Sequence, residues 1–136
     1  MTTDSALLSL VEEAKIARQK AYTPYSNFQV GAALLTSSGE IIHGCNVENA
    51  SYGLCLCAER TALCSAVSRG YRSFVAMAVV ADTPESCKPC GSCRQFLAEL
   101  CPQDFPVMLS NLQGKTEQWT VAELLPGSFT GKDLVK

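Results

Sequence analysis

The chain has 136 residues, which one domain over residues 1–136 accounts for and which suffices to bury a core without disulfide bonds. Eleven Lys and Arg residues against thirteen Asp and Glu residues give a net charge of −2, and no basic run occurs, so a nucleic-acid polymer is not an expected partner. The hydrophobic share of 47% is high for a small monomer, so we expect some surface to be buried between subunits.

Hydrophobic periodicity and turn residues predict the helices and strands. Apolar residues recur at helical spacing in some segments and form short apolar runs in others, with Gly-, Pro- and Ser-containing turns between them. In chain order, the sequence predicts a helix over 4–21, strands over 28–36 and 40–48, a helix over 57–70, a strand over 74–81, a helix over 91–100, strands over 106–110 and 116–120, and a short helix over 121–125.

This order predicts a three-layer α/β/α sandwich on a five-stranded mixed sheet. The segment 74–81 is apolar almost throughout, as expected of a central strand that is covered on both faces. The last two strands are joined by about five residues, and a parallel crossover needs about a dozen or more, so we expect this pair to be antiparallel.

The ends and the cysteine content of the chain bear on its location. The N-terminal residues show no basic segment followed by an apolar one, and no stretch reaches the length of a membrane span. Eight cysteines in such a chain favour a reducing compartment, in which some thiols serve metal binding or catalysis. We therefore expect a cytoplasmic protein with no membrane partner.

Three cysteines carry the strongest chemical signal. Cys57 and the pair Cys90 and Cys93 lie at the predicted starts of two helices, where unpaired N–H groups and the helix dipole favour thiolates. A right-handed crossover would bring both helix starts to one edge of the sheet. Three thiolates that leave a fourth position open are typical of catalytic zinc, whereas structural zinc sites are closed by four ligands. The sequence therefore predicts one Zn²⁺ per chain.

Charged neighbours of these cysteines fit the same interpretation. Glu59 lies two residues after Cys57, where a carboxylate could carry the protons of a reacting water. Three thiolates around Zn²⁺ leave a net charge of −1, and Arg60 and Arg94 lie within one turn of the cysteines. We expect these guanidinium groups to donate hydrogen bonds to sulfur and to offset that charge.

Other uses of these residues remain open from the sequence. The Cys-x-x-Cys pair could be redox-active, or Cys55 or Cys87 could close a structural zinc site. His43, the only histidine, is expected to hold a strand position without a catalytic role. Glu12 and Glu13 are expected on the solvated face of the first helix. The cysteines outside the trio are expected to be small buried hydrophobes or incidental thiols; they are Cys45, Cys55, Cys64, Cys87 and Cys101.

Four segments resemble the small homotetrameric cytidine deaminases, specifically the branch with three cysteine ligands. They are 24–32 (PYSNFQVGA), 45–52 (CNVENASY), 57–60 (CAER) and 89–95 (PCGSCRQ). The likeness spans essentially the whole chain. It implies zinc-dependent hydrolysis of cytidine and 2′-deoxycytidine to the uridines with release of ammonia, a reaction of pyrimidine salvage.

The resemblance also implies individual roles. Cys57, Cys90 and Cys93 would hold zinc, and Glu59 would carry protons between water, ring N3 and the departing amine. The implied substrate contacts are Phe28 on the pyrimidine, Asn46 and Glu48 on the ribose hydroxyls, the Ala58 N–H on the base oxygen, and Phe129 from a neighbouring subunit. The implied assembly is a homotetramer with active sites at subunit interfaces.

The residues themselves support part of this assignment and leave part open. Asn46 and Glu48 are two residues apart near the end of a predicted strand, so their side chains should point to one face. Phe28 could instead be a core residue of the first strand.

Three alternative functions remain. One is a deaminase of polymeric DNA or RNA or of a nucleotide. The acidic charge balance disfavours a polymer. The antiparallel final strand pair does too, since nucleic-acid-editing relatives of the family resemble a parallel arrangement with a helix between those strands. A deaminase of an antibiotic nucleoside such as blasticidin S would share the zinc chemistry, although the pair Asn46 and Glu48 favours plain nucleosides. A non-enzymatic zinc module would have no open coordination position.

Overall fold

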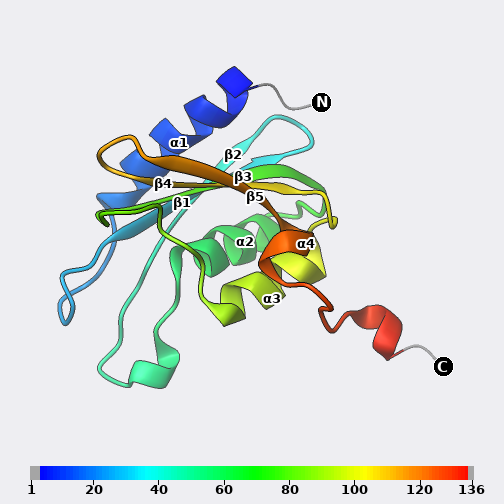
Figure 1. The fold of residues 1–136 in the computed structure, drawn as a ribbon. Helices are drawn as coiled ribbons and strands as arrows, with labels where there is room; N and C mark the ends of the chain where they lie inside the picture. Colours follow the sequence, from blue (N-terminus) through cyan, green and yellow to red (C-terminus); the bar gives the residue numbers. More distant parts are fainter. Residues whose placement is uncertain (1–3, 135–136) are drawn as a thin grey trace.

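The computed structural model describes residues 4–134 and contains a five-stranded sheet with the strand order β2-β1-β3-β4-β5. Helices cover both faces of the sheet, with α1 on one side and α2 and α3 on the other (Figure 1). The elements are α1 (Asp4–Arg18), β1 (Val30–Thr36), β2 (Ile41–Cys45), α2 (Ala58–Ser68), β3 (Phe74–Ala81), α3 (Gly91–Leu100), β4 (Pro106–Asn111), β5 (Thr116–Thr120) and α4 (Val121–Leu124), with 3₁₀ turns at Tyr52–Leu54 and Gly131–Asp133. The predicted sandwich on a mixed sheet is confirmed.

The sheet combines both strand directions. β1 is antiparallel to β2 and to β3, whereas β3 and β4 are parallel and are connected through α3. β5 returns antiparallel to β4 after a short turn. The carboxyl end of β3 therefore leads into the loop that precedes α3, on the side of the molecule where α2 also begins.

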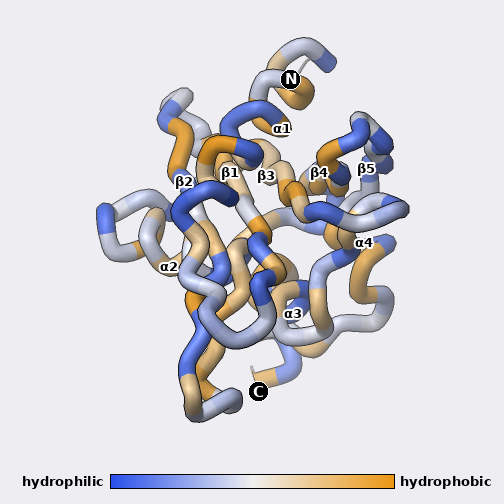
Figure 2. Tube along the Cα trace, turned by 90° about the vertical axis from the view of Figure 1, so that its left-hand side faces the viewer, coloured by the Kyte–Doolittle hydropathy of each residue, from blue (hydrophilic) through white to orange (hydrophobic). Residues whose placement is uncertain are grey.

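Two apolar clusters hold the layers together, one on each face of the sheet. Leu63 of α2 and Leu97 of α3 belong to the cluster on one face, and Leu10 of α1 belongs to the cluster on the other. β3 contributes alternately to both clusters, as expected of a central strand, and Figure 2 shows its largely hydrophobic trace in the middle of the sheet. None of the helices within residues 4–134 is long and apolar enough to cross a membrane.

The predicted bounds differ from the structure mainly around the first two strands. α1 ends at Arg18 rather than near residue 21, β1 begins at Val30 rather than 28, and β2 ends at Cys45 rather than 48. The residues that flank these strands also pair with a segment outside the sheet. The Tyr22 N–H donates to the Asn46 carbonyl at 3.0 Å, and the Glu48 N–H donates to the Tyr22 carbonyl at 2.9 Å. Contacts between distant segments thus override the local strand pattern.

Two glycines allow helices to approach the sheet closely. A Cβ on Gly31 would lie 2.1 Å from the Ala14 carbonyl oxygen of α1, and a Cβ on Gly44 would lie 2.4 Å from the Ala58 carbonyl oxygen of α2. Both obstacles are backbone atoms, so a side chain could be accommodated only if a whole helix moved. Gly44 therefore sets how closely the first turn of α2 approaches β2.

We expect Gly44→Ala and Gly31→Ala each to lower the free energy of unfolding by about 1–3 kcal/mol, because overpacking against backbone cannot be relieved by a rotamer change. Urea denaturation followed by circular dichroism measures the effect. Gly53→Ala is the matched control, since a Cβ at this position would meet no atom within 4 Å beyond its own chain neighbours. A Gly44→Ala protein as stable as Gly53→Ala would contradict the close approach.

Candidate active site

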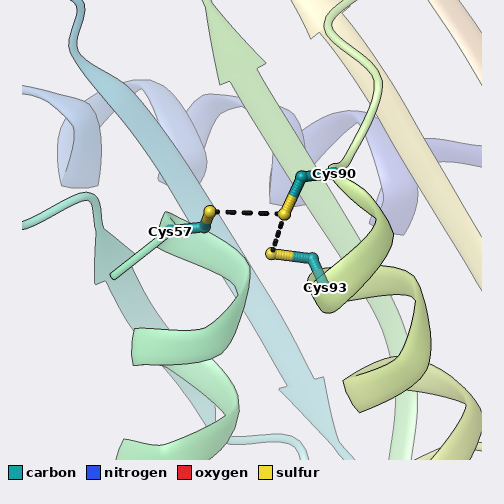
Figure 3. A group of neighbouring side chains, drawn as sticks. All are labelled: Cys57, Cys90 and Cys93. Atoms are coloured by element: carbon teal, nitrogen blue, oxygen red, sulfur yellow. Dashed lines mark hydrogen bonds between the residues drawn. The ribbon is translucent and has the colours of Figure 1, made fainter. Parts of the chain in front are cut away.

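The sulfur atoms of three cysteines meet at the starts of two neighbouring helices. Cys57 is the N-cap of α2, Cys90 is the N-cap of α3, and Cys93 lies in the first turn of α3. Figure 3 shows their side chains pointing toward one another. The Sγ atoms of Cys57 and Cys90 are 3.5 Å apart, those of Cys90 and Cys93 are 3.4 Å apart, and all three lie within 4.8 Å of one another. The predicted convergence is confirmed.

The donor set fits zinc. Zn–S bonds of about 2.3 Å in tetrahedral geometry place two sulfurs about 3.8 Å apart, close to the separations observed here. Within residues 4–134, the group of potential ligands contains these three cysteines, and neither Cys55 nor Cys87 belongs to it. The structure therefore gives no support to a site closed by a fourth cysteine. Three protein ligands are the arrangement of a catalytic ion with an open position.

The cluster favours a negative charge at Cys57. Its pKa is lowered to about 5, first by the hydrogen bond with the Cys93 thiol and further by the Arg60 guanidinium, while burial opposes the shift. Donating that hydrogen bond raises the pKa of Cys93, and burial adds to the effect. Arg60 Nη2 lies 3.7 Å from Cys57 Sγ and 3.1 Å from the Cys55 carbonyl oxygen. The expected contact between Arg60 and sulfur is present.

Arg94 has a different role from the one predicted. Its Nε donates to the Pro89 carbonyl at 2.9 Å and its Nη1 donates to the Leu124 carbonyl at 2.8 Å. The guanidinium is thereby committed to backbone oxygens and ties the loop before α3 to α4. Arg60, not Arg94, supplies the positive charge beside the sulfurs.

Glu59 is the buried acid of the site. It lies in the first turn of α2, is 4% exposed, and lines the same pocket as Cys57 and Cys90. Burial raises the pKa of its carboxyl to about 7; the Cys57 charge adds to this, while its own backbone N–H and the Cys93 thiol oppose it. A carboxyl group with a pKa near neutrality can both accept and release a proton.

A cavity of about 250 Å³ extends from the sulfurs and contains most of the predicted substrate contacts. Phe28 is 41% exposed, so it does not belong to the core, and the core alternative for this ring is wrong. The lining residues are Phe28, Val30, Asn46, Glu48, Cys55, Leu56, Cys57, Ala58, Glu59, Cys87, Lys88 and Cys90. Five residues predicted to bind substrate or catalyse thus line one pocket: Phe28, Asn46, Glu48, Ala58 and Glu59.

Asn46 shapes the wall of this pocket as well as lining it. Its Oδ1 accepts a hydrogen bond from the Val30 N–H, and its Nδ2 donates to the Phe28 carbonyl, both at 2.8 Å. The amide thus pairs with the backbone on either side of Gln29 as a neighbouring strand would. This contact fixes the segment that carries the Phe28 ring.

Glu48 holds the preceding part of the same wall. Its carboxylate accepts hydrogen bonds from the Tyr25 and Ser26 N–H groups, at 3.0 and 3.2 Å, and from the Ser26 hydroxyl. The Ser26 hydroxyl, followed by the two N–H groups, keeps the pKa of Glu48 below its usual value, although desolvation opposes them. Ser26 was not predicted as a functional residue, although it lies two residues before Phe28 in the segment 24–32.

Phe129 and His43, which were also considered from the sequence, are not among the residues that line the pocket. Phe129 is 58% exposed, and its carbonyl accepts a hydrogen bond from Gln95 Nε2 of α3 at 2.8 Å. His43 Nε2 is 2.7 Å from Glu13 Oε1 of α1, which agrees with a non-catalytic position on β2. Glu13 therefore makes a contact between elements, whereas it was expected only on a solvated helix face.

Comparison with known proteins agrees with this geometry. Residues 4–109 match the family described as the cytidine and deoxycytidylate deaminase zinc-binding region. A cytidine deaminase of Halalkalibacterium halodurans is 61% identical over 125 residues, which cover 92% of this chain and 95% of that protein. A cytidine deaminase of Sporosarcina psychrophila is 58% identical over 125 residues, with 92% of both chains covered.

A solved structure shows the same fold. The crystal structure of cytidine deaminase from Burkholderia pseudomallei superposes with a TM-score of 0.89 at 54% identity, over 94% of this chain and 100% of that one. The chain therefore belongs to the cytidine and deoxycytidylate deaminase family and carries its zinc-binding region.

Proposed function

We propose that this protein is a zinc-dependent deaminase that hydrolyses cytidine and 2′-deoxycytidine to uridine and 2′-deoxyuridine and releases ammonia, as in pyrimidine salvage. The observation that carries this proposal is the cluster of three cysteine sulfurs beside a pocket that is lined by two of these cysteines, Cys57 and Cys90, and by the buried Glu59 carboxyl group. The 61% identity to a protein named cytidine deaminase supports the choice of substrate.

Cys57, Cys90 and Cys93 would hold the zinc ion. When bound, the ion supplies a Lewis acid that activates water at neutral pH. Arg60 offsets the negative charge that three thiolates leave around a divalent cation, because its guanidinium contacts Cys57 Sγ at 3.7 Å.

Glu59 is assigned the proton transfers. Hydrolysis must move a proton from the attacking water to the pyrimidine and must protonate the leaving amine. The Glu59 carboxyl group can take the first proton of the water and deliver it to ring N3 as the oxygen adds to C4. It can then take the remaining proton of the added hydroxyl group and pass it to the amine, so that the C4–N bond breaks, ammonia leaves and the uridine carbonyl forms. Its burial beside the cysteines supports this role, since few water molecules compete for its protons.

The remaining pocket residues would bind the nucleoside. Phe28 would pack on the pyrimidine ring, and the Ala58 N–H, in the first turn of α2, would meet the base oxygen. Asn46 and Glu48 would bind the ribose hydroxyls. Both side chains keep a hydrogen-bonding group for a ligand. The Asn46 amide uses one of its two N–H donors. A carboxylate has about four acceptor sites, and three of those on Glu48 are filled.

We also propose that the protein is a homotetramer in which Phe129 completes the site of a neighbouring subunit. Large apolar side chains are exposed along the loops beside the pocket, and such patches mark protein interfaces. The exposed residues on these loops are Tyr25, Tyr52, Leu54 and Leu56, and Phe129 is exposed on the separate tail that follows α4. All eight cysteines are free thiols, which supports a cytoplasmic location.

Replacing any of Cys57, Cys90 and Cys93 by serine should lower the zinc content well below one ion per chain, because each variant loses one of three sulfur ligands. Metal analysis of the purified protein, with circular dichroism to verify folding, measures this. Cys64→Ser is the control, since this exposed cysteine lies on α2 outside the cluster. Full zinc retention in a Cys93→Ser protein would contradict the ligand assignment.

Glu59→Gln should retain zinc and the fold but lose turnover by about 10⁴-fold, because an amide of the same shape cannot relay protons. The change in ultraviolet absorbance as cytidine becomes uridine measures the rate, and cytosine, dCMP and blasticidin S test the choice of substrate. Glu40→Gln, an exposed carboxylate at the start of β2, is the control and should keep wild-type activity. Near-normal turnover of zinc-loaded Glu59→Gln would refute the assigned role.

Phe129→Ala should raise KM for cytidine by about tenfold or more, because burial of a phenylalanine ring contributes about 1.5–3 kcal/mol. Steady-state kinetics and sedimentation equilibrium measure KM and the oligomeric state. Leu134→Ala, in the same tail and 72% exposed, is the control. If KM and the assembly are unchanged in Phe129→Ala, the proposed contact between subunits is wrong.

A further inference from the structure

The loop between β3 and α3, residues 82–90, delivers Cys90 to the sulfur cluster and carries Cys87 and Lys88 into the pocket lining. The loop contains no helix or strand. Its conformation must therefore be fixed by contacts with neighbouring elements. The β4–β5 hairpin supplies several of these contacts, in addition to the hydrogen bond that the Pro89 carbonyl accepts from Arg94 of α3.

Glu117 of β5 makes the most extensive of these contacts. Its carboxylate accepts hydrogen bonds from the Ser86 hydroxyl, from Lys88 Nζ at 3.3 Å, and from Trp119 Nε1 at 3.2 Å. Lys88 Nζ also lies 5.9 Å from the centre of the Trp119 ring, within the range of a cation–π contact. The Glu117 side chain thus binds Ser86 and Lys88, which lie near the end of the loop, just before Pro89.

The two loop residues need this partner for different reasons. Ser86 is 6% exposed, so its hydroxyl has little access to water if the carboxylate is removed. Lys88 is the cation among the pocket-lining residues, and Glu117 provides its counter-charge. The hydrogen bond from Ser86, followed by those from Trp119 and Lys88, keeps the pKa of Glu117 below its usual value. The carboxylate is therefore charged at neutral pH and can accept all three bonds.

We propose that Glu117 is a positioning residue for the metal centre: by holding Ser86 and Lys88 from the edge strand, it fixes the segment that presents Cys90. This inference rests on the proposed zinc site, to which Glu117 contributes no ligand atom. Loss of the carboxylate leaves Cys90 on a loop with fewer restraints, so zinc should escape more readily.

Other contacts also join the 82–90 loop to the β4–β5 hairpin. Comparing them with the Glu117 contacts distinguishes positioning of Cys90 from general anchoring of the loop. Asn111 Nδ2 donates to the carbonyls of Thr83 and Pro84 at 2.9 and 3.1 Å, which holds the beginning of the loop rather than its end. Lys115 Nζ is 2.9 Å from Glu85 Oε2, but both side chains are more than half exposed, at 58% and 68%. An exposed ion pair adds little to stability, and this also holds for Lys88 and Glu117, which are 43% and 42% exposed. Glu117 differs from Glu85 in its hydrogen bond with the buried Ser86 hydroxyl. Glu85 is therefore a matched control for Glu117.

The test measures the rate at which the zinc-loaded protein releases its metal to the chelator 4-(2-pyridylazo)resorcinol. Glu117→Ala should release zinc about tenfold faster than wild type, the lower end of the effect found when supporting contacts around a metal site are lost. Glu117→Gln should fall between them: Ser86 and Trp119 donate to different carboxylate oxygens, so the single amide oxygen can keep only one of these two bonds, and the amide cannot neutralise Lys88. Glu85→Gln should release zinc at the wild-type rate.

The outcomes distinguish positioning from simple stabilisation. Wild-type release rates in Glu117→Ala and Glu117→Gln, or an equal acceleration in Glu85→Gln, would overturn the inference. So would a lower unfolding midpoint of the zinc-free Glu117→Ala protein without faster zinc release. If Glu117→Ala does not fold, Glu117→Gln alone decides. The proposed function fails separately, if the wild-type protein neither binds zinc nor deaminates cytidine.

Discussion

The site depends on the close packing of α2 against β2 at Gly44. Without a Cβ at this position, the Ala58 and Ala62 backbone lies directly on the strand, and the Thr61 hydroxyl bridges to the Cys45 backbone at 3.0 and 2.8 Å. The distance of the first turn of α2 from β2 and the direction of this turn are therefore both fixed. This turn carries the Cys57 sulfur and the Glu59 carboxyl group. A small change in its distance from β2 would therefore separate both groups from the α3 sulfurs.

Charge at the site is balanced by neighbours that do not bind the metal. The helix starts place partly unpaired N–H groups near the sulfurs, and Arg60 adds a full positive charge next to Cys57. On the other side of the centre, the Glu117 carboxylate balances Lys88. The negative charge of the sulfur cluster is thus offset by groups that leave all three sulfurs available to a metal ion.

Two polar side chains of the pocket hold its wall in place. Asn46 and Glu48 bind the backbone of the segment that carries Phe28, and each keeps unused hydrogen-bonding capacity toward the cavity. The wall of the pocket is therefore built before a ligand arrives. Pre-formed donors and acceptors of this kind reduce the ordering cost of binding.

The sequence by itself determined the order of helices and strands, the bounds of β3 and α3, and the three sulfurs with their adjacent acid. These features are encoded locally, in apolar periodicity, in helix-start residues and in the spacing of Cys90 and Cys93. Only the tertiary structure decided that β2 stops at Cys45, that Arg94 binds carbonyls instead of sulfur, and that Glu117 supports the metal-binding loop. Each of these depends on contacts between residues far apart in the chain, which no local pattern specifies.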